Sequence, residues 1–246
     1  MRFAYVVAVA CIASGTAVFL ACSDDPPATP SGTSTSSSTS STSSSSGQPP
    51  GDDDDEPEVD SGIKRAPNGC ILHSTDYQKA GKAESLPRDG VSGGGVVWTT
   101  PEGAISEDGN FAIVSLEDGQ ESATLVLTDY KFDIPADKAT YGITVQLKRQ
   151  SLDAGIRDSA IEVILDTNEI PRSKFVGSDW PRVIVGTHHY GQEVDTWGTD
   201  LNPPNINRTA FGARISAKRN PGVTGPVLGR VDSVKIRVSY CNPDGL

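Results

Sequence analysis

The feature that most constrains the fold is a period of two in the placement of apolar residues. Near the end of the chain, Val234, Ile236, Val238 and Tyr240 alternate with Lys235, Arg237 and Ser239. Successive side chains of an extended strand point to opposite faces, so this pattern predicts a strand with one buried face and one solvated face. A helix would instead repeat its apolar positions every three to four residues.

The same alternation recurs in three other segments, which are residues 143–147, 161–165 and 211–218. Less regular strand candidates are residues 96–99, 111–116, 123–128 and 182–186. Clusters of Gly, Pro, Asn and Asp separate these segments, as is typical of short strands joined by turns. We therefore predict an all-β antiparallel β-sandwich over residues 62–246, and a jelly-roll-like arrangement is the one we expect.

The amino terminus has the pattern of an export signal. One basic residue, Arg2, precedes an uncharged apolar run from Phe3 to Ala21, and the chain turns polar after Cys22. Residues 18–22, Val-Phe-Leu-Ala-Cys, resemble the lipobox of bacterial lipoproteins, which implies signal residues 1–21 and lipid attachment to the Cys22 thiol. Two alternatives stay open at this point: an uncleaved signal anchor, since about 20 apolar residues can span a bilayer, and a plain cleaved signal.

The acidity of the chain lies mainly before residue 62. The net charge is −11, and residues 1–61 hold nine acidic residues and one basic residue, which leaves a net charge of −3 for the remainder. From Ser31 to Ser46, fifteen of sixteen residues are Ser or Thr. Such a segment cannot bury enough apolar surface to fold, so we expect residues 22–61 to form a disordered tether. This charge balance argues against nucleic acid as a partner.

Two cysteines, Cys70 and Cys241, stand near the two ends of the expected sandwich. An exported protein meets an oxidising compartment, where we expect the two thiols to pair. The alternative is two free buried thiols. A structural zinc site would need four ligands, so metal binding by two isolated cysteines is disfavoured.

Several motifs in the second half of the chain resemble a β-sandwich module of bacterial surface proteins. The residues that carry the resemblance are 108–112 (DGNFA), 125–135 (LVLTDYKFDIP), 141–145 (YGITV), Trp180, 190–191 (YG), 195–198 (DTWG), 207–213 (NRTAFGA) and 231–234 (VDSV). The module is found in lipoproteins of myxobacteria and their relatives and in some phage tail proteins. The resemblance implies a jelly-roll-like fold displayed outside the cytoplasm, in the bacterial cell envelope, and it implies no activity.

No motif in the sequence identifies a catalytic activity. Residues 90–94 (GVSGG) fit the letters of Gly-x-Ser-x-Gly, but they belong to a Gly-rich loop that lets the chain enter the strand expected at residues 96–99. His-Glu-x-x-His is absent, and carboxylates such as Asp129 and Asp133 cannot be paired from sequence alone. We therefore interpret the sandwich as a non-catalytic binding or structural display module. The alternative is a carbohydrate-binding module or a carbohydrate-active hydrolase, which would need two carboxylates flanking a cleft.

Candidate ligand-binding residues are Trp180, in an expected loop, and Tyr190 beside His188, because exposed aromatic rings can stack on sugars. Trp98 and Trp197 are expected in the core instead. If the protein takes a cofactor, calcium is the candidate, with Asp195 and Asp200 as ligands. The expected partners are a lipid bilayer through Cys22 and, for the sandwich, a surface polysaccharide or another envelope protein. An outer-membrane or cell-surface location is the one we expect.

Overall fold

The structure, a computed structural model, describes residues 64–165, 172–222 and 224–242. The expected signal peptide, residues 1–21, and the expected tether, residues 22–61, lie outside these residues, and so does the predicted lipid acceptor Cys22. Within the described ranges, no helix is both long enough and apolar enough to cross a membrane.

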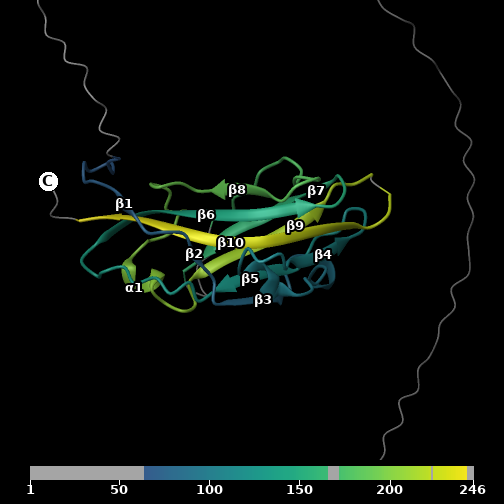
Figure 1. Cartoon of the computed structure of the whole chain (residues 1–246), viewed down its shortest axis with the longest axis horizontal. Helices are drawn as coiled ribbons and strands as arrows, with labels where there is room; N and C mark the ends of the chain where they lie inside the picture. Colours follow the sequence, from purple (N-terminus) through teal and green to yellow (C-terminus); the bar gives the residue numbers. More distant parts are fainter. Residues whose placement is uncertain (1–63, 166–171, 223, 243–246) are drawn as a thin grey trace, which may run out of the picture. The chain divides into compact units, whose positions relative to one another are not determined.

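The described residues form strands of 2 to 15 residues, two 3-10 turns and one short helix (Figure 1). In chain order the elements are β1 (His73–Ser74), β2 (Gln78–Lys79), β3 (Lys82–Leu86), η1 (Ser92–Gly94), η2 (Pro101–Ala104), β4 (Ala112–Leu116), β5 (Thr124–Thr128), β6 (Ala139–Ser151), β7 (Ile156–Ile164), β8 (Gly186–Tyr190), α1 (Pro203–Ile206), β9 (Gly212–Arg219) and β10 (Val227–Cys241). The all-β fold class predicted from the alternation is confirmed.

The strands form two antiparallel sheets. In the six-stranded sheet, β10 pairs with β6 along one edge and with β4, β2 and β1 in turn along the other, and β8 pairs with the far edge of β6. The four-stranded sheet has the order β3-β5-β9-β7. From β4 to β10, consecutive strands alternate between the two sheets. This is the alternation of a jelly roll, so the expected arrangement is also confirmed.

The core lies between the two sheets. Ile143, Val145 and Leu147 of β6 are fully buried, and their polar neighbours in sequence face away from the core. The alternating apolar residues of β10 are buried in the same way, and β5 and β9 supply Leu125, Leu127 and Ile215 from the other sheet. Burial of one large aliphatic side chain stabilises the fold by about 1.5–3 kcal/mol, and this gain is what fixes the inner face of each strand.

Three features of the expected strand pattern are wrong. Residues 96–99 make only isolated bridges, Val96 to Ser122 and Thr99 to Ile113, because they lie between the two 3-10 turns. The strand expected at residues 182–186 begins only at its last residue and runs on to Tyr190 as β8. Strands β1, β2 and β3 were not predicted, because the first two are two residues long and the Lys-Ala-Glu-Ser-Leu sequence of β3 contains only two apolar residues.

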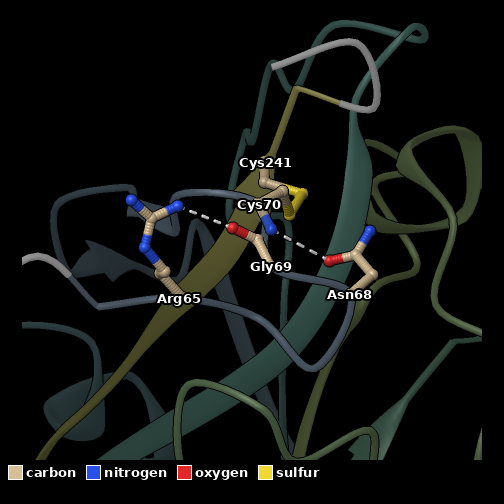
Figure 2. Close-up of a disulfide and its surroundings, with 5 residues drawn as sticks. All are labelled: Arg65, Asn68, Gly69, Cys70 and Cys241. Carbon is tan, nitrogen blue, oxygen red and sulfur yellow. Dashed lines mark hydrogen bonds between the residues drawn. A yellow bond between two sulfur atoms is a disulfide. The ribbon is translucent and has the colours of Figure 1, made fainter. Parts of the chain in front are cut away.

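Cys70 and Cys241 form a disulfide, as the sequence predicted (Figure 2). The bond joins the first described segment to the last residue of β10. Ala66 packs against the two cysteines in a small buried cluster separate from the main core, with Leu72 and Tyr141 at its margin. The bond therefore fixes residues 64–72 to the end of the six-stranded sheet.

Candidate functional site

The outer face of the six-stranded sheet carries a row of polar and aromatic side chains. Because Ile143 and Val145 point into the core, Thr144 and Gln146 of β6 point outward. The strand register places Thr144 beside Arg237 of β10, and Gln146 beside His189 of β8. Gln146 Nε2 and His189 Nε2 are 3.1 Å apart, within hydrogen-bond distance.

Tyr77 joins this row from the segment just before β2. Its ring centroid lies 5.0 Å from the Arg237 guanidinium carbon and 6.0 Å from the centroid of the His189 ring, with an angle of 49° between the two rings. Tyr77 is half-buried, and a cation at this distance from a tyrosine ring is attracted to its face. The ring is thereby held between β10 and β8.

One wall beside this row is the segment that follows β8, residues 191–194. It packs closely on β6, since a side chain at Gly142 would meet the backbone of Gln192 and Glu193 at 2.5 Å. The Asp195 carbonyl accepts a 3.0 Å hydrogen bond from the Ile143 amide, which ties the end of the segment to the sheet.

Trp197 anchors the same segment to the core. It is completely buried, and its indole Nε1 donates a 2.9 Å hydrogen bond to the Ile143 carbonyl. Its backbone has a φ of 56°, and its amide donates to Asp195 Oδ1 at 2.9 Å, so the chain bends and turns the indole inward. The expectation that Trp197 is a core residue is confirmed, and so is that for Trp98, which is 2% exposed.

The opposite wall is a hairpin of residues 64–72. Arg65 bridges to Ile71, and the Leu72 amide donates to the Lys64 carbonyl at 2.9 Å. Figure 2 shows the Arg65 guanidinium donating to the Gly69 carbonyl at 2.8 Å, beside the disulfide. The disulfide holds this hairpin against the sheet.

Together these elements enclose an open groove of about 660 Å³. Its lining residues are Lys64, Arg65, Leu72, Tyr77, Thr144, His189, Gly191, Gln192, Glu193, Val194 and Arg237. The Thr144 hydroxyl is buried at this lining, and no described residue makes a hydrogen bond with it. A buried hydroxyl without a partner is unfavourable by about 1–3 kcal/mol, so a ligand hydroxyl that reached Thr144 Oγ1 on binding would relieve that cost.

Trp180 and Tyr190, which the sequence suggested as exposed ligand-binding rings, lie in the core instead. They are 1% and 4% exposed, so neither ring can stack on a ligand at the surface. The Trp180 indole and the Tyr190 hydroxyl donate hydrogen bonds of 2.8 and 2.6 Å to the two carboxylate oxygens of Asp158. Sequence reasoning failed here because a buried carboxylate that satisfies both polar groups could not be foreseen.

His188, the third residue of that group, is half-buried and lies outside the groove. Its ring centroid is 4.9 Å from that of Tyr190, and it lines a small cavity of about 100 Å³ beside Arg149. Burial lowers the pKa of His188, and the nearby Arg149 guanidinium lowers it further. It therefore belongs with the buried cluster and not with the groove.

The two carboxylates suggested for calcium do not form a metal site with their described neighbours. Asp195 Oδ2 lies 2.7 Å from the Lys174 ammonium, and Asp200 is exposed. Within residues 64–165, 172–222 and 224–242, no group of three or more His, Cys, Asp or Glu side chains comes together in a way that could hold a metal ion.

The residues that form the groove were not among the sequence-derived candidates. Thr144 and Arg237 stood at outward positions of strands that the alternation had located, so their exposure to one face could have been inferred. Their proximity to Tyr77 and His189 depends on which strands pair and in what register. Neither the pairing of the strands nor their register is encoded in a local sequence pattern.

The sequence matches no protein-family model and no curated protein. Among solved structures, the chain is similar to the CBM1 module of BiXyn10A in its apo form, with 7% identity and a TM-score of 0.35 over 67% of this chain and 95% of that chain. It is also similar to a CBM4 structure, with 11% identity and a TM-score of 0.30 over 63% and 92% of the two chains. A third is the N-terminal cellulose-binding domain of β-1,4-glucanase C from Cellulomonas fimi, with 11% identity and a TM-score of 0.28 over 70% and 96%. All three likenesses are weak in both identity and TM-score.

Proposed function

We propose that the β-sandwich is a non-catalytic module that binds a saccharide in the groove on the outer face of the six-stranded sheet. The observation that carries this proposal is the Thr144 hydroxyl, buried at the groove lining without a hydrogen-bond partner among the described residues. Hydroxyl-rich ligands both donate and accept hydrogen bonds, so a sugar hydroxyl that reaches Thr144 Oγ1 on binding satisfies it.

The other lining groups suit the same ligand class. The rings of Tyr77 and His189 supply apolar surface for the face of a sugar ring, while Gln192 and Glu193 are hydrogen-bonding side chains. Glu193 is the sole carboxylate among the described lining residues. Glycoside hydrolysis ordinarily uses a pair of carboxylates, so binding is supported better than hydrolysis.

A glycan array probed with the full-length chain tests the proposal, followed by titration of Thr144→Val on any glycan bound. Valine keeps the shape of threonine and removes the hydroxyl without a partner, so folding stability should hold or rise while affinity falls about fivefold to tenfold. Thr124→Val, in β5 of the other sheet, is the matched control and should bind like wild type. Equal affinity of Thr144→Val and wild type would place the ligand elsewhere, and an array with no bound glycan would reject the saccharide.

We also propose that the chain is a bacterial lipoprotein, with lipid on Cys22 and residues 22–61 as a tether between the cell-envelope membrane and the sandwich. This rests on the lipobox-like residues 18–22 and the Ser/Thr-rich run. Cys22→Ser should move the protein out of the detergent phase or leave an unprocessed precursor, whereas Cys11→Ser, inside the apolar run, should behave like wild type. If Cys22→Ser partitions and is processed like wild type, the lipid anchor is wrong and a signal anchor takes its place.

A further inference from the structure

The groove carries an excess of positive charge although the protein as a whole is acidic. Its described lining contains three permanent cations, Lys64, Arg65 and Arg237, and one carboxylate, Glu193. The whole chain has a net charge of −11, and the part from residue 62 onward has a net charge of −3. A local excess of two positive charges on such a background is a feature of this face and not of the composition.

The single carboxylate does not neutralise its neighbours. Glu193 Oε1 lies 2.7 Å from the Lys64 ammonium and 3.5 Å from Arg237 Nη2, so one negative charge is shared between two cations. The Glu193 and Arg237 side chains are 20% and 30% exposed, which leaves the guanidinium partly open to the groove. One unit of positive charge therefore stays uncompensated at this pair of contacts.

Arg65 adds the second uncompensated charge. Its guanidinium donates to the neutral carbonyl of Gly69 (Figure 2). No carboxylate of the described residues lies within ion-pair distance of it. The disulfide holds its hairpin at the groove, so the cation is positioned there even though its side chain is exposed.

The position of Arg237 suits an oxyanion ligand. Its guanidinium is stacked near the Tyr77 ring, with 5.0 Å from the guanidinium carbon to the ring centroid. Such stacking restricts the guanidinium plane, and a guanidinium can then donate two parallel hydrogen bonds to a carboxylate or a sulfate. The Thr144 hydroxyl lies on the neighbouring strand, directly across the ladder from Arg237.

We infer that the saccharide bound in this groove is anionic, with a carboxylate or sulfate group held by Arg237 and Arg65 while a neighbouring sugar hydroxyl meets Thr144. This inference rests on the proposed saccharide-binding function and adds the chemical class of the sugar. The anionic group compensates the positive charge that Glu193 leaves unneutralised. The Tyr77 ring packs against both the Arg237 guanidinium and the sugar ring.

Two matched pairs of polysaccharides test the inference with the full-length chain. Polygalacturonate and its methyl ester differ in esterification of the carboxyl group, which removes its charge, and dextran sulfate and dextran differ in sulfation. We expect one acidic member to bind at least tenfold more tightly than its neutral partner, and we expect its affinity to fall as salt rises from about 0.05 M to about 0.5 M. The pair that responds identifies the anionic group as carboxylate or sulfate.

Variants of the groove locate the effect. Arg237→Gln should weaken binding of the responding acidic polysaccharide about tenfold and Arg65→Gln about threefold, since a hydrogen bond to a charged group is lost in each. Arg182→Gln, an exposed charge outside the groove, should bind like wild type. The folding of each variant is checked by its unfolding midpoint.

The outcomes separate the inference from the proposal on which it stands. Groove-dependent binding of neutral glycans, with no preference for the acidic members, would overturn the inference and leave the saccharide-binding function in place. Equal binding of poly-L-glutamate would show attraction to any polyanion and would also overturn it. If no glycan on the array and none of the four polysaccharides binds, both are wrong.

Discussion

Tyr190 and Asp158 join the two sheets of the sandwich, because the Tyr190 hydroxyl on β8 donates a 2.6 Å hydrogen bond to Asp158 Oδ2 on β7. Asp158 Oδ1 accepts from Arg149 Nη1 at 2.7 Å and from the Trp180 indole, and the carboxylate is fully buried. Burial raises the pKa of Asp158, and the Arg149 charge opposes that shift. The cluster is thus a buried ion pair with aromatic donors on either side.

Asp158→Asn should destabilise the fold by about 3–5 kcal/mol, because it leaves the buried Arg149 guanidinium without its counter-charge. Tyr190→Phe removes one donor only and should cost about 1–2 kcal/mol. Asp137→Asn, at an exposed ion pair with Lys138, is the control and should leave the unfolding midpoint unchanged. Denaturant unfolding of the full-length variants measures all three, and a wild-type midpoint for Asp158→Asn would contradict the structural role of the cluster.

Trp197→Ala should destabilise the protein by about 3–5 kcal/mol, since it empties a fully buried site and removes the hydrogen bond to the Ile143 carbonyl. Val183→Ala, at a side chain that is 89% exposed, should have an effect of about 0.5 kcal/mol or less. Equal unfolding midpoints for the two variants would refute the assignment of Trp197 to the core.

The Cys70–Cys241 bond closes a loop of 171 residues. In the chain-entropy account such a crosslink is worth about 5 kcal/mol, so the double variant Cys70→Ser/Cys241→Ser should unfold at a clearly lower denaturant concentration. Proteolysis without reduction, followed by mass spectrometry, should yield one peptide pair that contains both cysteines. Separate peptides with free thiols would show that the bond does not form.

Glu107 should contribute to stability in a pH-dependent way. Hydrogen bonds from Lys235 and then Lys148 lower the pKa of Glu107 from 4.5 to about 2. Because the folded-state pKa is depressed, the contribution is present above about pH 4.5 and is lost as the pH falls toward 2. The side chain is 35% exposed, so screening limits the effect to about 1 kcal/mol or less.

The measurement compares wild type and Glu107→Gln by denaturant unfolding at several pH values. The wild type should be the more stable of the two near pH 7, and the gap should close near pH 2. A gap of constant size across this range would mean that Glu107 acts through packing and not through its charge.

The alternation of apolar residues predicted the fold because burial of one face is a local property of each strand. Residues 143–147 and 234–240 therefore lie within the strands where the pattern placed them. The disulfide could also be predicted, since only two cysteines remain once Cys11 and Cys22 are set aside. The groove could not, because Tyr77, Thr144, His189 and Arg237 come together through strand register and not through spacing along the chain.

The predictions for Trp197 and Trp180 show that local sequence predicts local features and not contacts between distant residues. Trp197 was expected inside because a glycine follows it in a motif that suits a bend, and that bend is local. Trp180 was a candidate for the surface because it lies between Asp179 and Pro181, yet it is buried against a carboxylate 22 positions earlier in the chain. A polar partner inside the core overrides the polarity of the flanking sequence.

The place of β10 in the six-stranded sheet sets the order in which the protein can assemble. β10 pairs with β6 along one edge and with β4, β2 and β1 along the other, yet it follows all of them in the chain. A polypeptide that emerges amino terminus first thus presents β1, β2 and β4 before the strand with which they pair. The sheet closes only after residue 241 has emerged, and oxidation to the Cys70–Cys241 bond can follow only then. Until its last strand is available, a chain built in this way can form the four-stranded sheet but not the complete six-stranded one.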